Sequence, residues 1–160
     1  MILMATQSTF RDTVPAIVDR LLDTYGECPT IHHLDHCPLP SREAVIRILD
    51  DLHEVLYPGF GRRQNLQKNN VHFYVGQIMV NLHDLLTEQI ARSVKHDCDD
   101  NSLPVQEFEG RAQQLAVDFL DTLPNLRRTL ADDVQAAFDG DPASVGPVEV
   151  VFSYPGFEAI

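Results

Sequence analysis

The sequence of 160 residues has no tryptophan and only three cysteines, Cys28, Cys37 and Cys98. So few cysteines, in an odd number, exclude a disulfide-stapled secreted domain and suit a reducing compartment. The first residues lack the basic and long apolar segments of an export signal, and no later apolar run is long enough to cross a bilayer. We therefore expect a cytoplasmic protein that has no membrane partner.

Positive charge is scarce. Lysine and arginine together number 12 against 24 aspartates and glutamates, which gives a net charge of −12. A surface this acidic repels phosphate groups, so the composition excludes nucleic acids and anionic lipid surfaces as partners. The chain is nevertheless 44% hydrophobic, which is enough at this length for one ordinary globular domain.

Apolar residues recur at helical spacing along most of the chain. The first predicted helix has Thr13 as its N-cap and Pro15 in its first turn, and it ends at Gly26. The second is capped by Ser41 and stopped by Pro58 and the glycine that follows it. The apolar positions of these two helices are Val14, Ile17, Val18, Leu21, Leu22 and Tyr25, and then Val45, Leu49, Leu52 and Leu56.

The third predicted helix begins near Val71 and has an apolar face too wide for a lightly packed surface helix. Such a helix is either central to a bundle or also faces another subunit. Its two stripes are Val71, Val75, Ile78, Leu82 and Leu85, and Met79, Leu86 and Ile90. Two further helices are predicted, one lined by Val105, Phe108, Ala112, Leu115 and Phe119, the other by Leu126, Leu130, Val134 and Ala137.

The C-terminal segment is harder to assign. Val148–Phe152 has the β-branched composition of a strand but is too short to decide between an extended piece and one helical turn, and Phe157–Ile160 reads as the first turn of a helix. The pattern therefore predicts an all-α fold, a bundle of about five helices plus an irregular C-terminal arm. We divide it into a helical assembly domain, residues 1–140, and a linker arm, residues 141–160.

Polar stretches separate these elements. Gly61–Asn70 reads as an exposed linker and Asp97–Pro104 as a turn. The paired acids Asp50 and Asp51, Asp99 and Asp100, and Asp132 and Asp133 read as solvated helix faces and turns rather than acid–base dyads.

Five side chains that can bind zinc, Cys28, His32, His33, His36 and Cys37, lie within ten residues. Their spacing contains no C-x-x-C pair, and the chain would have to double back to place both cysteines on one ion. The simpler interpretation is a loop whose histidines cap backbone groups. We therefore expect no metal in this cluster.

Motifs for other catalytic chemistry are missing from the sequence: it has no G-x-S-x-G, no H-E-x-x-H and no glycine loop that would cradle a phosphate. On residue chemistry alone, Asp141 is best explained as the cap of a turn before Pro142. The residues by themselves indicate a helical domain without an assembled active site.

Three strings in order resemble a known family. They are "LPSREAVIRILDDLHEVLYPGF" (Leu39–Phe60), "DPA" (Asp141–Ala143) and "SYPGFEAI" (Ser153–Ile160). In this order and at this separation they resemble the N-terminal part of bacterial serine O-acetyltransferases of the long form, a likeness that covers about Cys28 to Ile160. The resemblance implies a helical N-terminal domain that precedes a catalytic left-handed β-helix of hexapeptide repeats.

The family forms O-acetylserine from acetyl-CoA and L-serine in cysteine biosynthesis, and its catalytic histidine and acetyl-CoA groove lie in the β-helix. The resemblance therefore implies no catalytic residue in this chain, and we expect residues 1–160 to be inactive alone. Asp141 matches the family's Asp-Pro-Ala aspartate, which binds the substrate serine and, in feedback-inhibited members, cysteine. A carboxylate suits this task because an α-ammonium offers three donors and a full positive charge.

The resemblance also implies partners. Helical domains of the family pack against one another, so we expect self-association through the predicted third to fifth helices, and contact with O-acetylserine sulfhydrylase through a C-terminus that these 160 residues lack. The alternative interpretation is a stand-alone helical interaction module without catalysis, supported by the wide apolar face of the third helix. A small metal-binding protein is a third interpretation and rests only on the cysteine and histidine cluster.

Overall fold

The computed structural model describes residues 3–97 and 105–158, and every regular element in these ranges is a helix. The predicted all-α class is confirmed. The chain divides into two compact units, Met1–His36 and Cys37–Ile160, which are considered separately. The expected turn at Asp97–Pro104, with Asp99 and Asp100, lies almost wholly outside the described residues, as does Cys98. None of the described helices has the length and apolar character needed to span a membrane.

The first unit contains the helix α1 (Leu3–Glu27) and a single 3-10 turn, η1 (Pro29–Ile31). The predicted start at Thr13 is wrong, because the helix begins ten residues earlier and Pro15 lies in its interior. Proline has no N–H group, so the helix lacks one backbone bond at this point. The predicted apolar stripe of α1 is exposed, with side chains such as Leu21 (51%) and Leu22 (53%) open to solvent.

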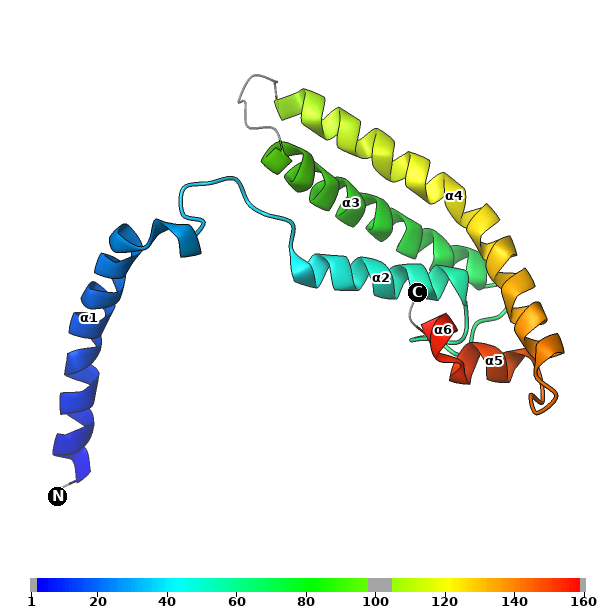
Figure 1. Cartoon of the computed structure of the whole chain (residues 1–160), viewed down its shortest axis with the longest axis horizontal. Coiled ribbons are helices and arrows are strands. Elements are labelled where there is room, and N and C mark those ends of the chain that lie inside the picture. Colours follow the sequence, from blue (N-terminus) through cyan, green and yellow to red (C-terminus); the bar gives the residue numbers. More distant parts are fainter. Residues whose placement is uncertain (1–2, 98–104, 159–160) are drawn as a thin grey trace. The chain divides into compact units, whose positions relative to one another are not determined.

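The second unit is built on three long helices that lie side by side (Figure 1). They are α2 (Arg42–Leu56), α3 (Val71–Asp97) and α4 (Val105–Gly140). The predicted cap of α2 is confirmed, because the Ser41 hydroxyl accepts a hydrogen bond from the Ala44 N–H at 3.3 Å. The Ser41 N–H donates in turn to Gln89 Oε1 at 2.7 Å and so ties this cap to α3.

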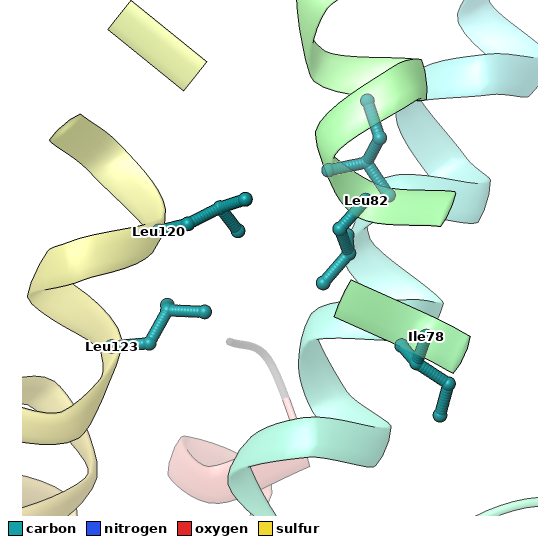
Figure 2. Packing of buried hydrophobic residues seen from close by; sticks show 5 residues of the cluster. Ile78, Leu82, Leu120 and Leu123 are labelled. Atoms are coloured by element: carbon teal, nitrogen blue, oxygen red, sulfur yellow. The ribbon is translucent and has the colours of Figure 1, made fainter. Parts of the chain in front are cut away.

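Helix α3 is the central element, with α2 on one side and α4 on the other (Figure 1). Leu82 is completely buried and forms one cluster with Ile78, Leu120 and Leu123. Figure 2 shows Leu120 and Leu123 of α4 pointing toward Leu82. Ile48 of α2 completes the cluster, and Met79, Leu85 and Leu86 pack against it. Packing on both neighbours explains why the apolar face of α3 is so wide.

Helix α4 replaces the two helices expected in this region. It runs unbroken through Pro124 and bends along its length, as a proline inside a helix predicts (Figure 1). Continuity changes which residues of α4 are buried: the buried stripe is Phe108, Ala112, Ala116, Leu120, Leu123, Leu130 and Val134. Leu115, Phe119 and Leu126, which we expected in the core, are 42%, 39% and 37% exposed.

The C-terminal segment is helical rather than irregular. It forms α5 (Pro147–Ser153) and α6 (Pro155–Glu158), so Val148–Phe152 is a helix and not a strand. Val150 is fully buried, and Val151 and Phe157 pack on a second cluster made by Leu56, Tyr57 and Leu130. This cluster attaches α5 and α6 to the end of α2 and to α4.

Candidate functional site

The turn that follows α4 holds Asp141, the site residue that the sequence singles out. Asp141 is partly buried and comes directly after Gly140, the last residue of α4. Its Oδ1 accepts a hydrogen bond from the Ala143 N–H at 2.9 Å, and its backbone carbonyl accepts one from the Ser144 N–H at 3.1 Å. These contacts form a compact Asx turn, as expected for aspartate before proline.

A second donor reaches Asp141 from thirteen residues further along the chain. The hydroxyl of Tyr154, the residue between α5 and α6, donates to Asp141 Oδ2. The backbone of Tyr154 is fixed on both sides, since its N–H donates to the Val150 carbonyl at 3.2 Å and its carbonyl accepts from the Phe157 N–H at 3.0 Å. Tyr154 was not among the residues predicted for a site, although the string "SYPGFEAI" contains it.

These two hydrogen bonds set the electrostatics of the turn. The Tyr154 hydroxyl, and secondarily the Ala143 N–H, lower the pKa of the Asp141 carboxyl below its ordinary value. The same hydrogen bond to Asp141 raises the pKa of the Tyr154 phenol. At neutral pH the pair is therefore an ionised carboxylate and a protonated phenol.

No lysine, arginine or histidine side chain forms an ion pair with Asp141 anywhere in residues 3–97 and 105–158. A carboxylate offers about four acceptor positions, of which Ala143 and Tyr154 occupy one each. The remaining positions, on a partly buried anion without a cation, suit a ligand that carries a positive charge and several N–H donors.

A second polar group lies where α2 meets the segment that follows it. Asp51 (6% exposed) and Glu54 (1% exposed) are buried on α2. The Arg62 guanidinium pairs with Asp51, and the Arg62 backbone N–H donates to Glu54 Oε1. The Tyr74 hydroxyl of α3 donates to Glu54 Oε2 at 2.7 Å. We call these four residues the clasp.

The clasp corrects two expectations. Asp51 is buried and paired rather than solvated, while Asp50, Asp132 and Asp133 are exposed as predicted. Gly61–Asn70 is mostly exposed, yet the clasp anchors its beginning at Arg62. Gly61 lies so close to Glu54 that a methyl group there would overlap the carboxylate. The sequence signal was Asp51 and Glu54 within the apolar pattern of α2, followed by two arginines.

The cysteine and histidine loop uses its side chains locally. His32 Nε2 donates to the Tyr25 carbonyl at 2.9 Å, and its Nδ1 accepts from the Leu34 N–H at 3.4 Å, so both ring nitrogens are occupied. The rings of His33 and His36 lie 4.9 Å apart. Within the described residues, no three cysteine, histidine or acidic side chains gather as a metal ion would require.

Comparison with known proteins gives two matches. The family described as "Serine acetyltransferase, N-terminal" matches residues 65–160, which include the Asp141 turn, α5 and α6. The chain is also 35% identical over 138 residues to "Serine acetyltransferase, plasmid" of Synechococcus elongatus. That alignment covers 82% of the chain but 43% of the relative, so the chain spans less than half of the relative's length.

Proposed function

Because the chain belongs to the serine acetyltransferase N-terminal family, we propose that it works as the helical N-terminal domain of an enzyme that acetylates L-serine. Acetyl-CoA is the co-substrate in this proposal, and O-acetylserine, an intermediate of cysteine biosynthesis, is the product. The transfer itself is assigned to a hexapeptide-repeat domain, as the family resemblance implies. The helical domain supplies one edge of the serine site.

Asp141 is the residue that supplies this edge. The observation that carries the proposal is an ionised carboxylate at a turn, held by Ala143 and Tyr154, with acceptor positions left over and no cation of its own among the described residues. The α-ammonium of serine has three N–H donors, which can fill the open acceptor positions of Asp141, and one positive charge, which can pair with the carboxylate. Cysteine carries the same α-ammonium and would compete for the same contact.

The surroundings decide how strongly this contact binds. A single ion pair that stays in contact with water contributes far too little free energy to bind a small molecule, even at millimolar affinity. We therefore expect residues 1–160 alone to bind no measurable serine and to have no acetyltransferase activity. In this proposal the contact between Asp141 and the ammonium becomes stronger only when a second protein surface covers it and excludes water.

The test is steady-state kinetics on the complete enzyme, with release of free CoA as the readout. Asp141→Asn preserves the shape of the side chain but removes its charge, so KM for serine should rise about tenfold or more, with a lower kcat. KM for acetyl-CoA serves as the internal control and should stay within about twofold. If the Asp141→Asn enzyme has unchanged serine kinetics, Asp141 only caps the turn and does not bind serine.

Self-association is a second proposal, through the exposed face of α4. Leu115, Phe119 and Leu126 lie on this face at spacings typical of one side of a helix, and all three are more than a third exposed. Apolar side chains gathered in this way favour contact with another copy of the chain. Sedimentation equilibrium should show a dimer or larger species, and Phe119→Ser should shift it toward monomer. A strict monomer at high micromolar concentration would contradict the proposal.

The alternative function, a helical interaction module without catalysis, predicts a different result. It places no small molecule at Asp141, so the Asp141→Asn protein should bind its partners as the native chain does. If the full-length protein that the gene encodes contains no hexapeptide repeats, the interaction module is favoured over the enzyme.

A further inference from the structure

We propose that Tyr154 is a positioning residue, which holds the Asp141 carboxylate in the orientation that receives the substrate ammonium. This inference rests on the proposed function of Asp141 and adds a residue to it. The carrying observation is that the two oxygens of one carboxylate are held by donors from two different elements, the turn after α4 and the end of α5.

The Asx turn alone would leave the carboxylate partly free. The Ala143 N–H fixes Oδ1, but rotation about the terminal torsion of aspartate is soft, so a single contact does not fix the plane of the group. The Tyr154 hydroxyl on Oδ2 supplies the second point. Two donors on two oxygens fix the plane and leave the outer acceptor positions with defined directions. A ligand then meets a site that needs little reorganisation.

Tyr154 can act as this second point because its own backbone is anchored. Val150, one turn before it, is fully buried, and Phe157, three residues after it, packs on the cluster of Leu56, Tyr57 and Leu130. Hydrogen bonds join Tyr154 to both Val150 and Phe157. The hydroxyl therefore reaches Asp141 from a support tied to α2 and α4, and its position does not depend on the turn itself.

The contact also affects the charge. The hydrogen bond from Tyr154 is the larger cause of the lowered pKa of Asp141, so the tyrosine helps to keep the carboxylate ionised as well as oriented. Phenylalanine at position 154 would preserve the ring and lose both effects. The two effects are separable, because loss of orientation raises KM at every pH, whereas the altered pKa matters only in acid.

A structural role for the same contact makes different predictions. If Tyr154 only pinned α5 to the end of α4, its loss would lower thermal stability and leave serine binding unchanged. The chain offers a matched control in Tyr74, whose hydroxyl also donates to a carboxylate oxygen, that of Glu54. Tyr74→Phe removes a tyrosine hydroxyl from the clasp. It therefore measures how much stability is lost with a tyrosine–carboxylate hydrogen bond that is distant from Asp141.

The experiment compares Tyr154→Phe, Tyr74→Phe, Asp141→Asn and the double variant of Tyr154 and Asp141 in the complete enzyme. We expect Tyr154→Phe to raise KM for serine about 3- to 10-fold, with kcat within about twofold. Tyr74→Phe should lower the melting temperature and leave KM for serine unchanged. In the Asp141→Asn background, Tyr154→Phe should add nothing.

A second readout needs no activity. Carbon-13 NMR titration of the Asp141 carboxyl in residues 1–160 should give a pKa below the usual value of about 3.9, and Tyr154→Phe should raise it toward that value. An unchanged pKa, or a Tyr154→Phe enzyme with native serine KM, would overturn the inference. If Asp141→Asn raises KM while Tyr154→Phe does not, the inference fails and the proposed function stands. If Asp141→Asn itself has no effect, the proposed function fails.

Discussion

Two carboxylates in the second unit receive the same pair of donors, a backbone N–H group and a tyrosine hydroxyl. Glu54 accepts from the Arg62 N–H and from Tyr74, and Asp141 accepts from the Ala143 N–H and from Tyr154. Their surroundings differ in two respects. Glu54 is 1% exposed and lies 3.6 Å from the Arg62 guanidinium, while Asp141 is only partly buried and has no cation among the described residues.

The difference indicates how one arrangement serves two purposes. A buried carboxylate is costly unless it is paired, so Glu54 with its arginine contributes to the fold and has nothing left to offer a ligand. A carboxylate at the surface costs little when unpaired, so Asp141 keeps acceptor positions open, as the proposed contact with a substrate ammonium requires.

Removing the cation from the clasp should have the largest effect on stability. Arg62→Ala leaves Asp51 and Glu54 buried without their positive partner, and we expect a loss of about 1–3 kcal/mol in the free energy of unfolding. This figure is below that for a fully buried pair because the Arg62 side chain is 58% exposed. Urea denaturation measures it.

The neighbouring arginine is the control for this prediction. Arg63 lies 5.2 Å from the centre of the Tyr74 ring and forms no ion pair with Asp51 or Glu54. Arg63→Ala should cost no more than about 1 kcal/mol, the usual size of an exposed cation–π contact. Equal losses for the two arginines would show that the clasp contributes nothing specific.

A larger residue at Gly61, next to the clasp, should have an intermediate effect on the stability of the protein. A methyl group at Gly61 would overlap the Glu54 carboxylate, which two hydrogen bonds and the ion pair with Arg62 hold in place, so Gly61→Ala should destabilise the protein by about 1–2 kcal/mol. Gly76→Ala is the matched control. Gly76 lies in α3 with open space around its Cα, and alanine there should stabilise the helix by about 0.5–1 kcal/mol. Thermal unfolding of the two variants should therefore shift in opposite directions.

Alkaline pH should produce the smallest effect, and it acts on both sites. Burial and the hydrogen bond to Glu54 raise the pKa of Tyr74, and the hydrogen bond to Asp141 raises that of Tyr154. A tyrosine whose pKa is raised on folding contributes stability that is present below its unfolded pKa of about 10 and is lost as pH rises through the folded value. The unfolding free energy should thus fall above about pH 10.

The two tyrosine variants separate these contributions. Tyr74→Phe and Tyr154→Phe should each reduce the dependence of the unfolding free energy on pH in this alkaline range. Tyrosinate absorbance provides the independent measure. Because burial also raises the pKa of Tyr57, each site is followed as the difference between the native protein and the variant that lacks its tyrosine. Coincident titration of the folded and unfolded protein would rule out raised pKa values at both sites.

The sequence predicted those parts of the fold that depend on local pattern. The cap at Ser41, the ends of α2 and the start of α3 follow from residues that act within one helical turn. It did not predict that α4 continues through Pro124, because tertiary packing against α3 overrides the local cost of proline. That continuity decided which face of α4 is buried.

The site could be predicted only in part, for a related reason. Asp141 was singled out only through the family resemblance of its Asp-Pro-Ala motif, whereas its partner Tyr154 lies thirteen residues away and meets it only after α5 has folded. The buried role of Glu54 was not predicted, because the partners that make its burial tolerable, Arg62 and Tyr74, come from later segments. Pairings across segments leave no periodic signal in the sequence.

The most direct test of the account measures two quantities, the serine KM of the complete enzyme and its free energy of unfolding, on Asp141→Asn and Glu54→Gln. The account predicts a reciprocal result. Asp141→Asn should raise KM about tenfold or more and leave the urea midpoint nearly unchanged, while Glu54→Gln should lower stability by about 1–3 kcal/mol and leave KM within about twofold. An Asp141→Asn protein that loses stability as Glu54→Gln does, while keeping native serine KM, would contradict it.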